Sequence, residues 1–563
     1  MARRGTARRR ADLDTDAADT VLVPAMTRTV FDAFMETAGA APDNVFLCAP
    51  PAAGRAWHPD GVEFTYRATK EAVLALTERY AAAGYGHGHR VALLLENRPE
   101  FFFHYLALNA LGGGIVPVNP DYRHDELLYQ MEHSGADLAV VTERRAGDVE
   151  AVARERGRKP LPVVAAERLP AALPAPEPAP RRGAPGLDTE ASLLYTSGTT
   201  GRPKGCILTN FYYLNAGAWY RDLGGRVVIE PGRERFLNPL PLFHMNAQAV
   251  TATCAILTAN CLAQPERFSP TRWWKDVVAS RATIIHYLGV MPPLLLNQPP
   301  CPEERQHRVK FGLGAGVEPE LHARFEERFG FPLVEVWGMT ETGRIYADCH
   351  EPRQTATRAF GRPFGGFEAR VVDDGDREAS RGTEGELCVR WGGAEGPRHG
   401  FFAGYLDNEA ATEEAWRGGW FHTGDVVRQA PDGMLYFVDR KKNIIRRAGE
   451  NIAAAEVEAC LQAHEAVAQV AVLAVADDVR EEEVMACVVP MPGVAADRAL
   501  AVRLQAWCLG RLAYFKAPGW VLFADALPTT GTQKVQKAQL FPKGEDPRRR
   551  PEAIDLRETK RRP

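Results

Sequence analysis

The chain has 563 residues, of which 45% are hydrophobic and 25% are charged, and this is enough to build several domains with large cores. Its 68 basic and 72 acidic residues nearly cancel, which excludes a strong overall attraction to nucleic acid or to an anionic membrane. No apolar run is long enough to cross a membrane. The arginine-rich N-terminus lacks the apolar core of a signal peptide, and the ten cysteines form no Cys-x-x-Cys pair, so we expect a cytoplasmic protein.

Strands and helices alternate along the first part of the chain, after a flexible tail expected over residues 1–25. The apolar spacing predicts a helix that includes Val73 and ends at Gly84. It is followed by strands over residues 91–95, 115–118 and 138–141, with helices over residues 99–111 and 125–133 between them. This alternation indicates an α/β fold, in which helices cover mostly parallel sheets.

The composition changes further along the chain. A loop rich in Pro and Ala is expected over residues 169–187. Short strands with glycine turns over residues 364–438 predict a small β-rich subdomain. Helices over residues 455–461 and 500–512 and strands over residues 470–475 and 484–489 predict a smaller, mobile α+β domain. The expected organisation is an N-terminal domain over 26–439, a C-terminal domain over 440–545 and a basic tail over 546–563.

The densest chemical signal is the loop Tyr195-Thr-Ser-Gly-Thr-Thr-Gly-Arg-Pro-Lys-Gly205, which directly follows a predicted strand. Its glycines free the backbone to wrap an anion, its hydroxyls donate hydrogen bonds, and Lys204 adds positive charge. The loop is not a Walker loop, because Lys204 lies between Pro203 and Gly205. We expect a polyphosphate site formed by Thr196, Ser197, Gly198, Thr199, Thr200 and Lys204.

Four more motifs follow in order: Pro239-Leu-Pro-Leu-Phe-His244, Phe311-Gly-Leu-Gly-Ala-Gly316, Val336-Trp-Gly-Met-Thr-Glu-Thr342 and Gly419-Trp-Phe-His-Thr-Gly-Asp425. With them, the chain resembles the adenylate-forming superfamily of acyl-CoA synthetases, luciferases and peptide-synthetase adenylation domains. The resemblance extends from about residue 27 to residue 537. Residues 402–405, among others, are similar to the crotonobetaine/carnitine-CoA ligase branch.

The resemblance assigns nucleotide-binding roles to residues in these motifs. It implies that Gly314, Ala315 and Gly316 line the adenine and the acyl pocket, and that Trp337, where the family usually has Tyr, packs beside them. Thr340 resembles the α-phosphate ligand and Glu341 the Mg²⁺ ligand, a role that suits a carboxylate. Asp425 and Arg440 resemble the residues that bind the ribose hydroxyls.

The resemblance also implies a moving C-terminal domain. Lys442 matches the hinge position, and Gly449 matches a loop glycine that lets the thiol of CoA pass. In Leu527-Pro-Thr-Thr-Gly-Thr-Gln-Lys534, Lys534 resembles the catalytic lysine that reaches the α-phosphate. Here Gln533 replaces a usual glycine.

The acid would lie beside the second motif. By resemblance, His244 orients the carboxylate, and the pocket includes Met245, Asn246, Gln248 and Gly338. These mixed side chains disfavour very long acyl chains, so the expected substrate is a small or medium-chain carboxylic acid, polar acids included.

The expected enzyme is an ATP-dependent acyl-CoA ligase that uses ATP, Mg²⁺ and CoA, as a monomer or homodimer without nucleic acid or an integral membrane anchor. Three alternatives stay open. The adenylate could be loaded onto a carrier protein, or the chain could be a non-catalytic homologue. The glycines near residues 312–316 could also bind a nicotinamide cofactor, although they lack the full dinucleotide fingerprint.

Overall fold

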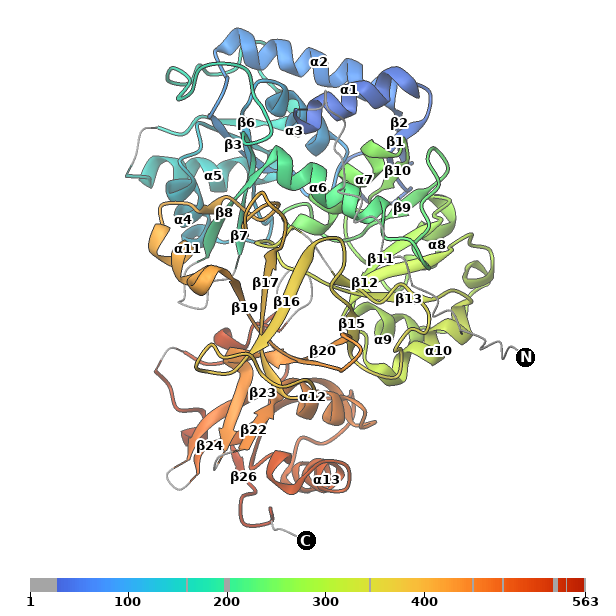
Figure 1. Cartoon of the computed structure of the whole chain (residues 1–563), viewed down its shortest axis with the longest axis vertical. Coiled ribbons are helices and arrows are strands. Elements are labelled where there is room, and N and C mark those ends of the chain that lie inside the picture. Colours follow the sequence, from blue (N-terminus) through green and yellow to red (C-terminus); the bar gives the residue numbers. More distant parts are fainter. Residues whose placement is uncertain are drawn as a thin grey trace, which may run out of the picture.

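The computed structural model describes residues 28–157, 160–196, 203–343, 346–447, 450–477, 480–529, 535–542 and 544–560. Three sheets and their helices form the larger part of the molecule, and a fourth sheet forms a smaller part at the opposite end from helices α1 and α2 (Figure 1). This is the predicted α/β class with a smaller α+β C-terminal part.

The first sheet is parallel over its central strands and antiparallel where β8 joins β7 and β18. Its order is β18 (Gly404–Tyr405), β8 (Lys204–Thr209), β7 (Glu190–Thr196), β4 (Gly114–Pro117), β3 (Arg90–Leu94), β5 (Leu138–Val141) and β6 (Val163–Ala165). The expected strands at 91–95, 115–118 and 138–141 are therefore confirmed to within two residues. Strand β18 comes from a segment 200 residues later in the chain, and it brings that segment against the phosphate loop.

The second sheet is parallel except at its two edges. Its order is β14 (Tyr346–Ala347), β13 (Leu333–Trp337), β12 (Phe311–Ala315), β11 (Ile284–Leu288), β9 (Arg235–Leu237), β10 (Cys261–Ala263), β1 (Val45–Ala49) and β2 (Val62–Thr65). The motifs that begin at Phe311 and Val336 thus occupy neighbouring parallel strands, and both run toward the same edge of the sheet.

Helices fill the space around these two sheets. They are α1 (Val30–Ala40), α2 (Tyr66–Ala83), α3 (Glu100–Ala110), α4 (His124–Ser134), α5 (Glu143–Glu155), α6 (Asn210–Arg221), the π-helix η2 (Asn246–Thr251), α7 (Ala252–Leu257), α8 (Trp273–Ala279), α9 (Met291–Leu296) and α10 (Pro319–Phe329). Helix α2 ends as predicted at Gly84, whose φ of 97° lies in the left-handed region that glycine tolerates. Helix α3 has nine buried residues out of eleven, as expected for a helix that is apolar on all faces.

The predicted β-rich subdomain is a five-stranded antiparallel sheet. Its order is β15 (Ala359–Gly361), β20 (Leu435–Arg440), β19 (Phe421–Gln429), β17 (Glu384–Trp391) and β16 (Phe367–Val372), and α11 (Glu409–Ala415) precedes β19. Strands β19 and β20 are paired so that Asp425 lies opposite Arg440.

The fourth sheet begins after the short helical turn η5 (Lys441–Asn443). Its order is β22 (Glu450–Ala453), β21 (Ile444–Arg447), β24 (Glu481–Pro490), β25 (Trp520–Phe523) and β26 (Ile554–Asp555), and β23 (Val467–Asp477) pairs with β24. Helices α12 (Ala454–Gln462) and α13 (Arg498–Leu509) contribute Val457, Leu461 and Leu504 to the same core.

The C-terminal tail is the one clear error in the predicted organisation. The segment from residue 546 to residue 560 is folded onto the C-terminal domain rather than forming a separate tail. Its strand β26 pairs with β25, and Leu556 is buried in the core. The sequence did not predict this packing, because Ile554 and Leu556 are only two apolar residues in a largely charged segment and produce no periodic pattern.

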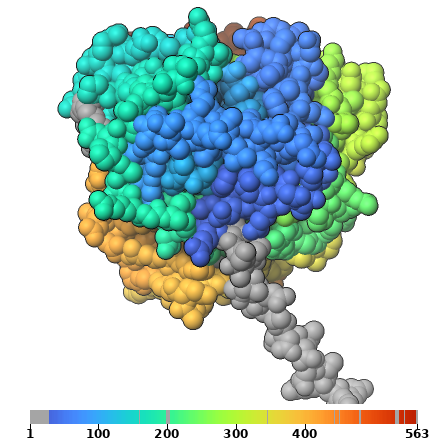
Figure 2. All heavy atoms as spheres, turned by 90° about the horizontal axis from the view of Figure 1, so that it is seen from above, coloured from blue at the N-terminus to red at the C-terminus, as the bar shows by residue number. Residues whose placement is uncertain are grey.

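Figure 2 views the molecule from the end opposite the C-terminal domain, where segments coloured blue to teal form most of the visible surface and green and orange segments lie at its margins. Among the described residues, no helix is both long and apolar enough to cross a membrane.

Candidate active site

The phosphate loop connects two neighbouring strands. Thr196 ends β7 and Lys204 begins β8, and these two residues are paired in the antiparallel ladder. The two ends of the loop therefore lie side by side. Ser197, Gly198, Thr199 and Thr200 lie outside the described residues.

Glu341 and Lys204 both contact the side chain of Tyr405. The Tyr405 hydroxyl donates a hydrogen bond of 2.9 Å to Oε1 of Glu341, and Lys204 Nζ lies 4.6 Å from the centroid of the Tyr405 ring. The backbone carbonyl of Glu341 accepts a hydrogen bond from the amide of Phe402 at 2.9 Å. The edge strand β18 thus ties the phosphate loop to the motif that contains Glu341.

The electrostatic surroundings of Glu341 suit a divalent cation. Burial raises the pKa of this carboxyl group, and the hydrogen bond from Tyr405 and the charges of Arg440 and Lys204 offset only part of that shift. A buried carboxylate that is costly to ionise gains most from a cation brought to it. Magnesium commonly binds to one or two carboxylates together with substrate phosphates, so Glu341 fits the predicted role.

The motif containing Thr340 is supported from helix α6. The Tyr212 hydroxyl donates a hydrogen bond of 2.7 Å to the backbone carbonyl of Thr340. Gly343 has a φ of 59°, and a Cβ atom there would lie 2.5 Å from the Tyr212 ring. Glycine is required at this position, so that the loop can turn closely around the tyrosine.

Asp425 forms a second charged centre beside this loop. The residue is only 2% exposed, and its Oδ2 accepts a hydrogen bond of 2.8 Å from the indole nitrogen of Trp337. Arg440 Nε lies 2.9 Å from Oδ1 of Asp425. The carboxylate is held by an indole on β13 and a guanidinium on β20, which fixes its direction.

Comparison with known proteins identifies the family. The sequence model of the AMP-binding enzyme family matches residues 34–406, and that of its C-terminal domain matches residues 456–534. The chain belongs to the AMP-binding enzyme family. The resemblance to adenylate-forming enzymes is therefore confirmed.

Known relatives of this AMP-binding enzyme agree over most of its length. It is 31% identical over 498 residues to the crotonobetaine/carnitine–CoA ligase of Citrobacter koseri. The aligned region covers 85% of this chain and 93% of the relative. The o-succinylbenzoate CoA synthetase of Bacillus subtilis, solved with its acyl-adenylate intermediate, is 26% identical with a TM-score of 0.76, covering 91% of this chain and 98% of that one. A structure of the same synthetase with ATP and magnesium gives a TM-score of 0.75 at 26% identity, covering 90% and 98%.

The buried side chain of Asn97 stabilises the predicted acid-binding loop, residues 239–244, of this AMP-binding enzyme. The Asn97 side chain donates to the carbonyls of Pro239 and Leu240 and accepts from the amide of Leu242, at 3.0–3.3 Å. His244, two residues later, is exposed and leads into the π-helix η2, a type of helix often found at functional sites.

The polar residues of the predicted pocket differ in their surroundings. Gln248 is fully buried; it accepts a hydrogen bond from the Tyr213 hydroxyl at 2.6 Å and donates to the Leu242 carbonyl at 2.6 Å. Its amide therefore supports the loop from inside the core, and the prediction that it lines the pocket is corrected. Met245 and Asn246 are partly exposed, and Gly338 is exposed.

The glycine-rich strand β12 packs against Tyr287 of the neighbouring strand. A Cβ atom at Gly314 would lie 2.3 Å from the Tyr287 carbonyl oxygen and 2.6 Å from its ring, so this glycine is required by the protein itself. Ala315 is half-buried and Gly316 is exposed, with a φ of 86°.

Glu335 holds the end of this strand and was not predicted from the sequence. Its carboxylate accepts hydrogen bonds from the amide of Gly316 at 2.7 Å and from the Tyr287 hydroxyl at 2.7 Å. Tyr405 and Tyr212 were missed in the same way. Tyrosines and acids that act through a neighbour have no motif of their own, although residues 402–405 had already indicated a relationship to one branch of the family.

Three predicted residues lie where the structure gives no contacts. Gly449 and Lys534 lie outside the described residues, and the side chain of Lys442 is not described either. Their roles in the hinge, the thiol passage and catalysis stay predictions.

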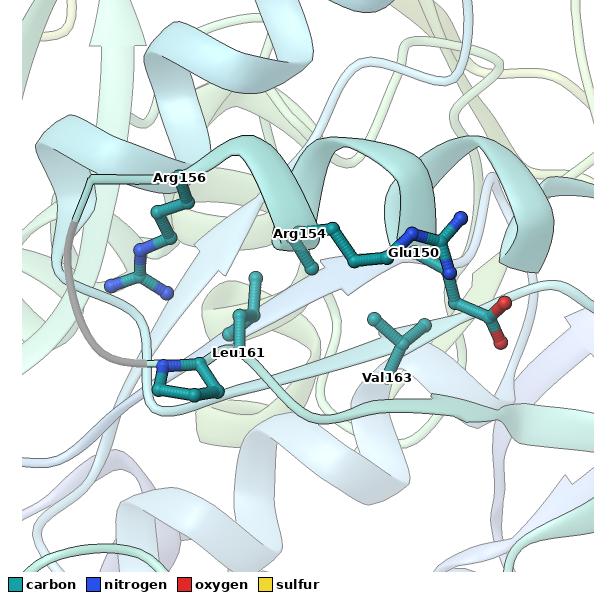
Figure 3. Close-up of a pocket in the computed structure, with 7 residues that line it drawn as sticks. Glu150, Arg154, Arg156, Leu161 and Val163 are labelled. Atoms are coloured by element: carbon teal, nitrogen blue, oxygen red, sulfur yellow. The ribbon is translucent and has the colours of Figure 1, made fainter.

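A separate pocket of about 430 Å³ is formed by residues that precede all of these motifs in the chain. Glu150, Arg154 and Arg156 from the region of α5 and Leu161 and Val163 from the following segment line it (Figure 3). None of the predicted site residues belongs to it.

Glu335 predicts a specific dependence of stability on pH. Burial raises its pKa from the ordinary value of 4.5 to about 7, against the opposing effects of His322 and Tyr287. Between these two values the folded chain binds more protons than the unfolded chain, so its stability falls as pH rises toward 7. We expect wild type to lose roughly 1–3 kcal/mol between pH 5 and 7.5 that Glu335→Gln keeps, measured by urea unfolding at each pH.

The matched control is Glu326→Gln. Burial opposes ionisation of Glu326, but the nearby His322 and the hydrogen bonds from Arg353 lower the pKa of this carboxyl group to about 2. The contribution of Glu326 is therefore constant above pH 5, and its replacement shifts stability without changing the slope. Equal slopes for wild type and Glu335→Gln would contradict the assignment.

Proposed function

We propose that this chain is an ATP-dependent acyl-CoA ligase that activates a small or medium-chain carboxylic acid. In the first half-reaction a carboxylate oxygen bonds to the α-phosphorus of ATP, and the bond from that phosphorus to the bridging oxygen breaks. Pyrophosphate leaves and acyl-AMP stays bound. In the second half-reaction the thiol of CoA loses its proton and its sulfur bonds to the acyl carbon. The bond from that carbon to the phosphate oxygen of the mixed anhydride breaks, and AMP leaves with the electron pair.

One observation carries this proposal: side-chain contacts connect the phosphate loop with Glu341, and they connect the motif that contains Glu341 with Asp425. Tyr405 connects Lys204 with Glu341, and Trp337 connects the end of β13 with Asp425. A triphosphate and a ribose need these groups on one surface. The Bacillus subtilis synthetase, which has been solved with ATP and magnesium and with its acyl-adenylate intermediate, supports this proposal.

The first half-reaction brings two anions together, so positive charge and hydrogen-bond donors are needed where they meet. We assign the donors to Thr196 and the loop residues that follow it, and the charge to Lys204 and, by resemblance, Lys534. Magnesium, when bound at Glu341, neutralises phosphate charge. Positioning and preorganised charge account for catalysis of this type without a protein nucleophile.

Asp425 is proposed to accept both ribose hydroxyls, with Arg440 beside it. The carboxylate is buried and oriented before the nucleotide arrives, and hydrogen bonds to a charged acceptor are among the strongest. Thr340 is assigned to the α-phosphate. Trp337 and the segment from Gly314 to Gly316 are assigned to the walls of the adenine and acyl pocket.

The second half-reaction requires the C-terminal domain to move. We propose that the domain turns about Lys442, that Lys534 withdraws, and that the loop with Gly449 admits the thiol. Gating of this kind separates two reactions that share one site.

The acid is proposed to lie beside His244, Met245, Asn246 and Gly338. The relative from Citrobacter koseri is named for crotonobetaine and carnitine, and the Bacillus subtilis neighbour is named for an aromatic dicarboxylate, o-succinylbenzoate. Both names favour a compact acid with a further polar or charged group over a long fatty acid.

The test is a screen for pyrophosphate release with ATP, Mg²⁺ and a panel of acids, each with and without CoA. The panel contains acetate, hexanoate, palmitate, benzoate, succinate, crotonobetaine and carnitine. We expect release that depends on a short acid, and a thioester when CoA is present. Pyrophosphate release without formation of an acyl-CoA thioester would indicate a carrier protein as the acyl acceptor. The absence of pyrophosphate release with every acid would contradict the proposal.

A further inference from the structure

The C-terminal segment of this chain extends past the part that matches the family. The C-terminal family model ends at residue 534, whereas residues 544–560 are folded. We call residues 554–560 the C-terminal clasp. Its strand β26 adds to the edge of β25, and the amide of Leu556 donates a hydrogen bond of 2.8 Å to the carbonyl of Gly519.

Polar contacts fix the clasp against helix α13. The Gln505 side chain donates a hydrogen bond of 2.9 Å to the carbonyl of Leu556, and the Thr559 hydroxyl donates one of 2.6 Å to Oε1 of Gln505. Because Gln505 is only 2% exposed, these bonds form inside the domain. The clasp therefore delivers its last described residue, Lys560, to a defined place.

Lys560 completes a buried ion network with two other residues. Its Nζ lies 2.6 Å from Oε1 of Glu483, and Nε of Arg447 lies 2.8 Å from Oε2 of the same carboxylate. The side chains of Lys560 and Glu483 are both 0% exposed, and that of Arg447 is 6% exposed. A buried carboxylate with two cations is strongly constrained, because removing one partner leaves charge uncompensated.

Arg447 places this network next to a functional segment. It ends β21 and pairs with Glu450 at the start of β22. Residues 448 and 449, which lie outside the described residues, connect these two strands in the sequence. Arg447 is also paired with Glu481 of β24. The contact with Glu483 thus holds the end of the hairpin against the central strand of the domain.

We propose that Lys560 is a positioning residue for thioester formation: through Glu483 it fixes Arg447, and with it the hairpin whose connection includes Gly449. This inference rests on the proposed function, in which that connection admits the thiol. Lys560 is buried and touches neither substrate nor cofactor in this role. Its effect is expected on the second half-reaction and not on the first.

The test compares the two half-reactions in the full-length chain. In Lys560→Met, which removes the charge and keeps an unbranched side chain, we expect acid-dependent pyrophosphate release within about twofold of wild type, because the phosphate loop is untouched. The rate of CoA-dependent consumption of supplied acyl-adenylate should fall by roughly 10- to 100-fold, as expected when a reacting group loses its position. Arg550→Gln, which removes an exposed pair with Glu545 on the same segment, is the matched control and should leave both rates unchanged.

Equal rates in Lys560→Met and wild type would overturn the proposal, and so would a parallel loss of both half-reactions. Lys560→Arg keeps the cation and should restore most of the thioester-forming rate. If wild type activates no acid, the proposed function fails, but the clasp is still testable by amide hydrogen exchange over residues 444–453.

That exchange experiment also serves if Lys560→Met does not fold. Burial lowers the pKa of Lys560 to about 8, Arg447 and Arg480 lower it as well, and Glu483 raises it. Cys508 of α13 is also a titratable neighbour, and its contact with Cys460 and its burial keep the pKa of its thiol high. In wild type, protection of residues 444–453, corrected for the intrinsic rate, should fall as pH rises past about 8. Constant protection up to pH 9.5 would overturn the proposed link between Lys560 and the hairpin.

Discussion

Replacing Asp425 by alanine is expected to lower kcat/KM for ATP by about 10²–10³, because hydrogen bonds to a charged acceptor contribute roughly 1.5–3 kcal/mol each. The change removes the proposed acceptor for two ribose hydroxyls. It also leaves Arg440 and the Trp337 indole without their shared partner. Initial rates of acid-dependent pyrophosphate release over a range of ATP concentrations measure the effect.

Two further variants separate a role in binding ribose from a role in folding. Trp337→Phe removes the indole donor but keeps a ring, so its loss should be smaller than that of Asp425→Ala. Asp432→Ala removes an exposed acid that pairs with Arg362 in the loops beside the same sheet and should have wild-type kinetics. With 2′,3′-dideoxy-ATP as substrate, wild type should resemble Asp425→Ala; an undiminished rate with this analogue would contradict the assignment.

The second large effect is expected at Lys534. Lys534→Ala should lose roughly 10²–10³ in the rate of adenylate formation, the usual cost of removing one preorganised charge-stabilising group. It should keep the conversion of supplied acyl-adenylate and CoA into thioester, because the proposed domain rotation takes this lysine away from the site before the thiol arrives. Single-turnover measurements of each half-reaction distinguish the two steps.

The nearby Lys537 provides the control for this loop. Lys537 Nζ lies 2.8 Å from Glu458 within the C-terminal domain, so Lys537→Ala should leave adenylate formation close to wild type. Equal losses in both half-reactions of Lys534→Ala would show that the lysine supports the fold rather than the first step. The effects of Lys534→Ala and Lys560→Met are therefore expected on opposite half-reactions.

The sequence predicted the sheets well because the strands and helices have strong apolar periods and clear ends. Gly84 and Gly135 end helices in left-handed conformations, and both ends were predicted from the sequence. The family was also predictable, since five short and distinctive motifs occur in the right order along the chain.

The contacts that join the motifs could not be predicted, because they connect distant segments. Tyr405 reaches Glu341 only because β18 pairs with β8, and a pairing of two residues leaves no periodic signal. Glu335 looks like an ordinary strand residue until Gly316 and Tyr287 are seen to bond to it. The clasp was mistaken for a tail because Lys560 resembles a solvent-exposed lysine in sequence, although its side chain is buried against Glu483.

The central claim is that one nucleotide contacts the phosphate loop, Glu341 and Asp425 at the same time. A crystal structure of the protein with ATP and Mg²⁺ tests it most directly. We predict that the triphosphate follows the bend between Thr196 and Lys204, that the metal contacts Glu341, and that the ribose hydroxyls bond to Asp425. A nucleotide bound elsewhere, such as the pocket beside Arg154 and Arg156, with Asp425 contacting only Trp337 and Arg440, would contradict it.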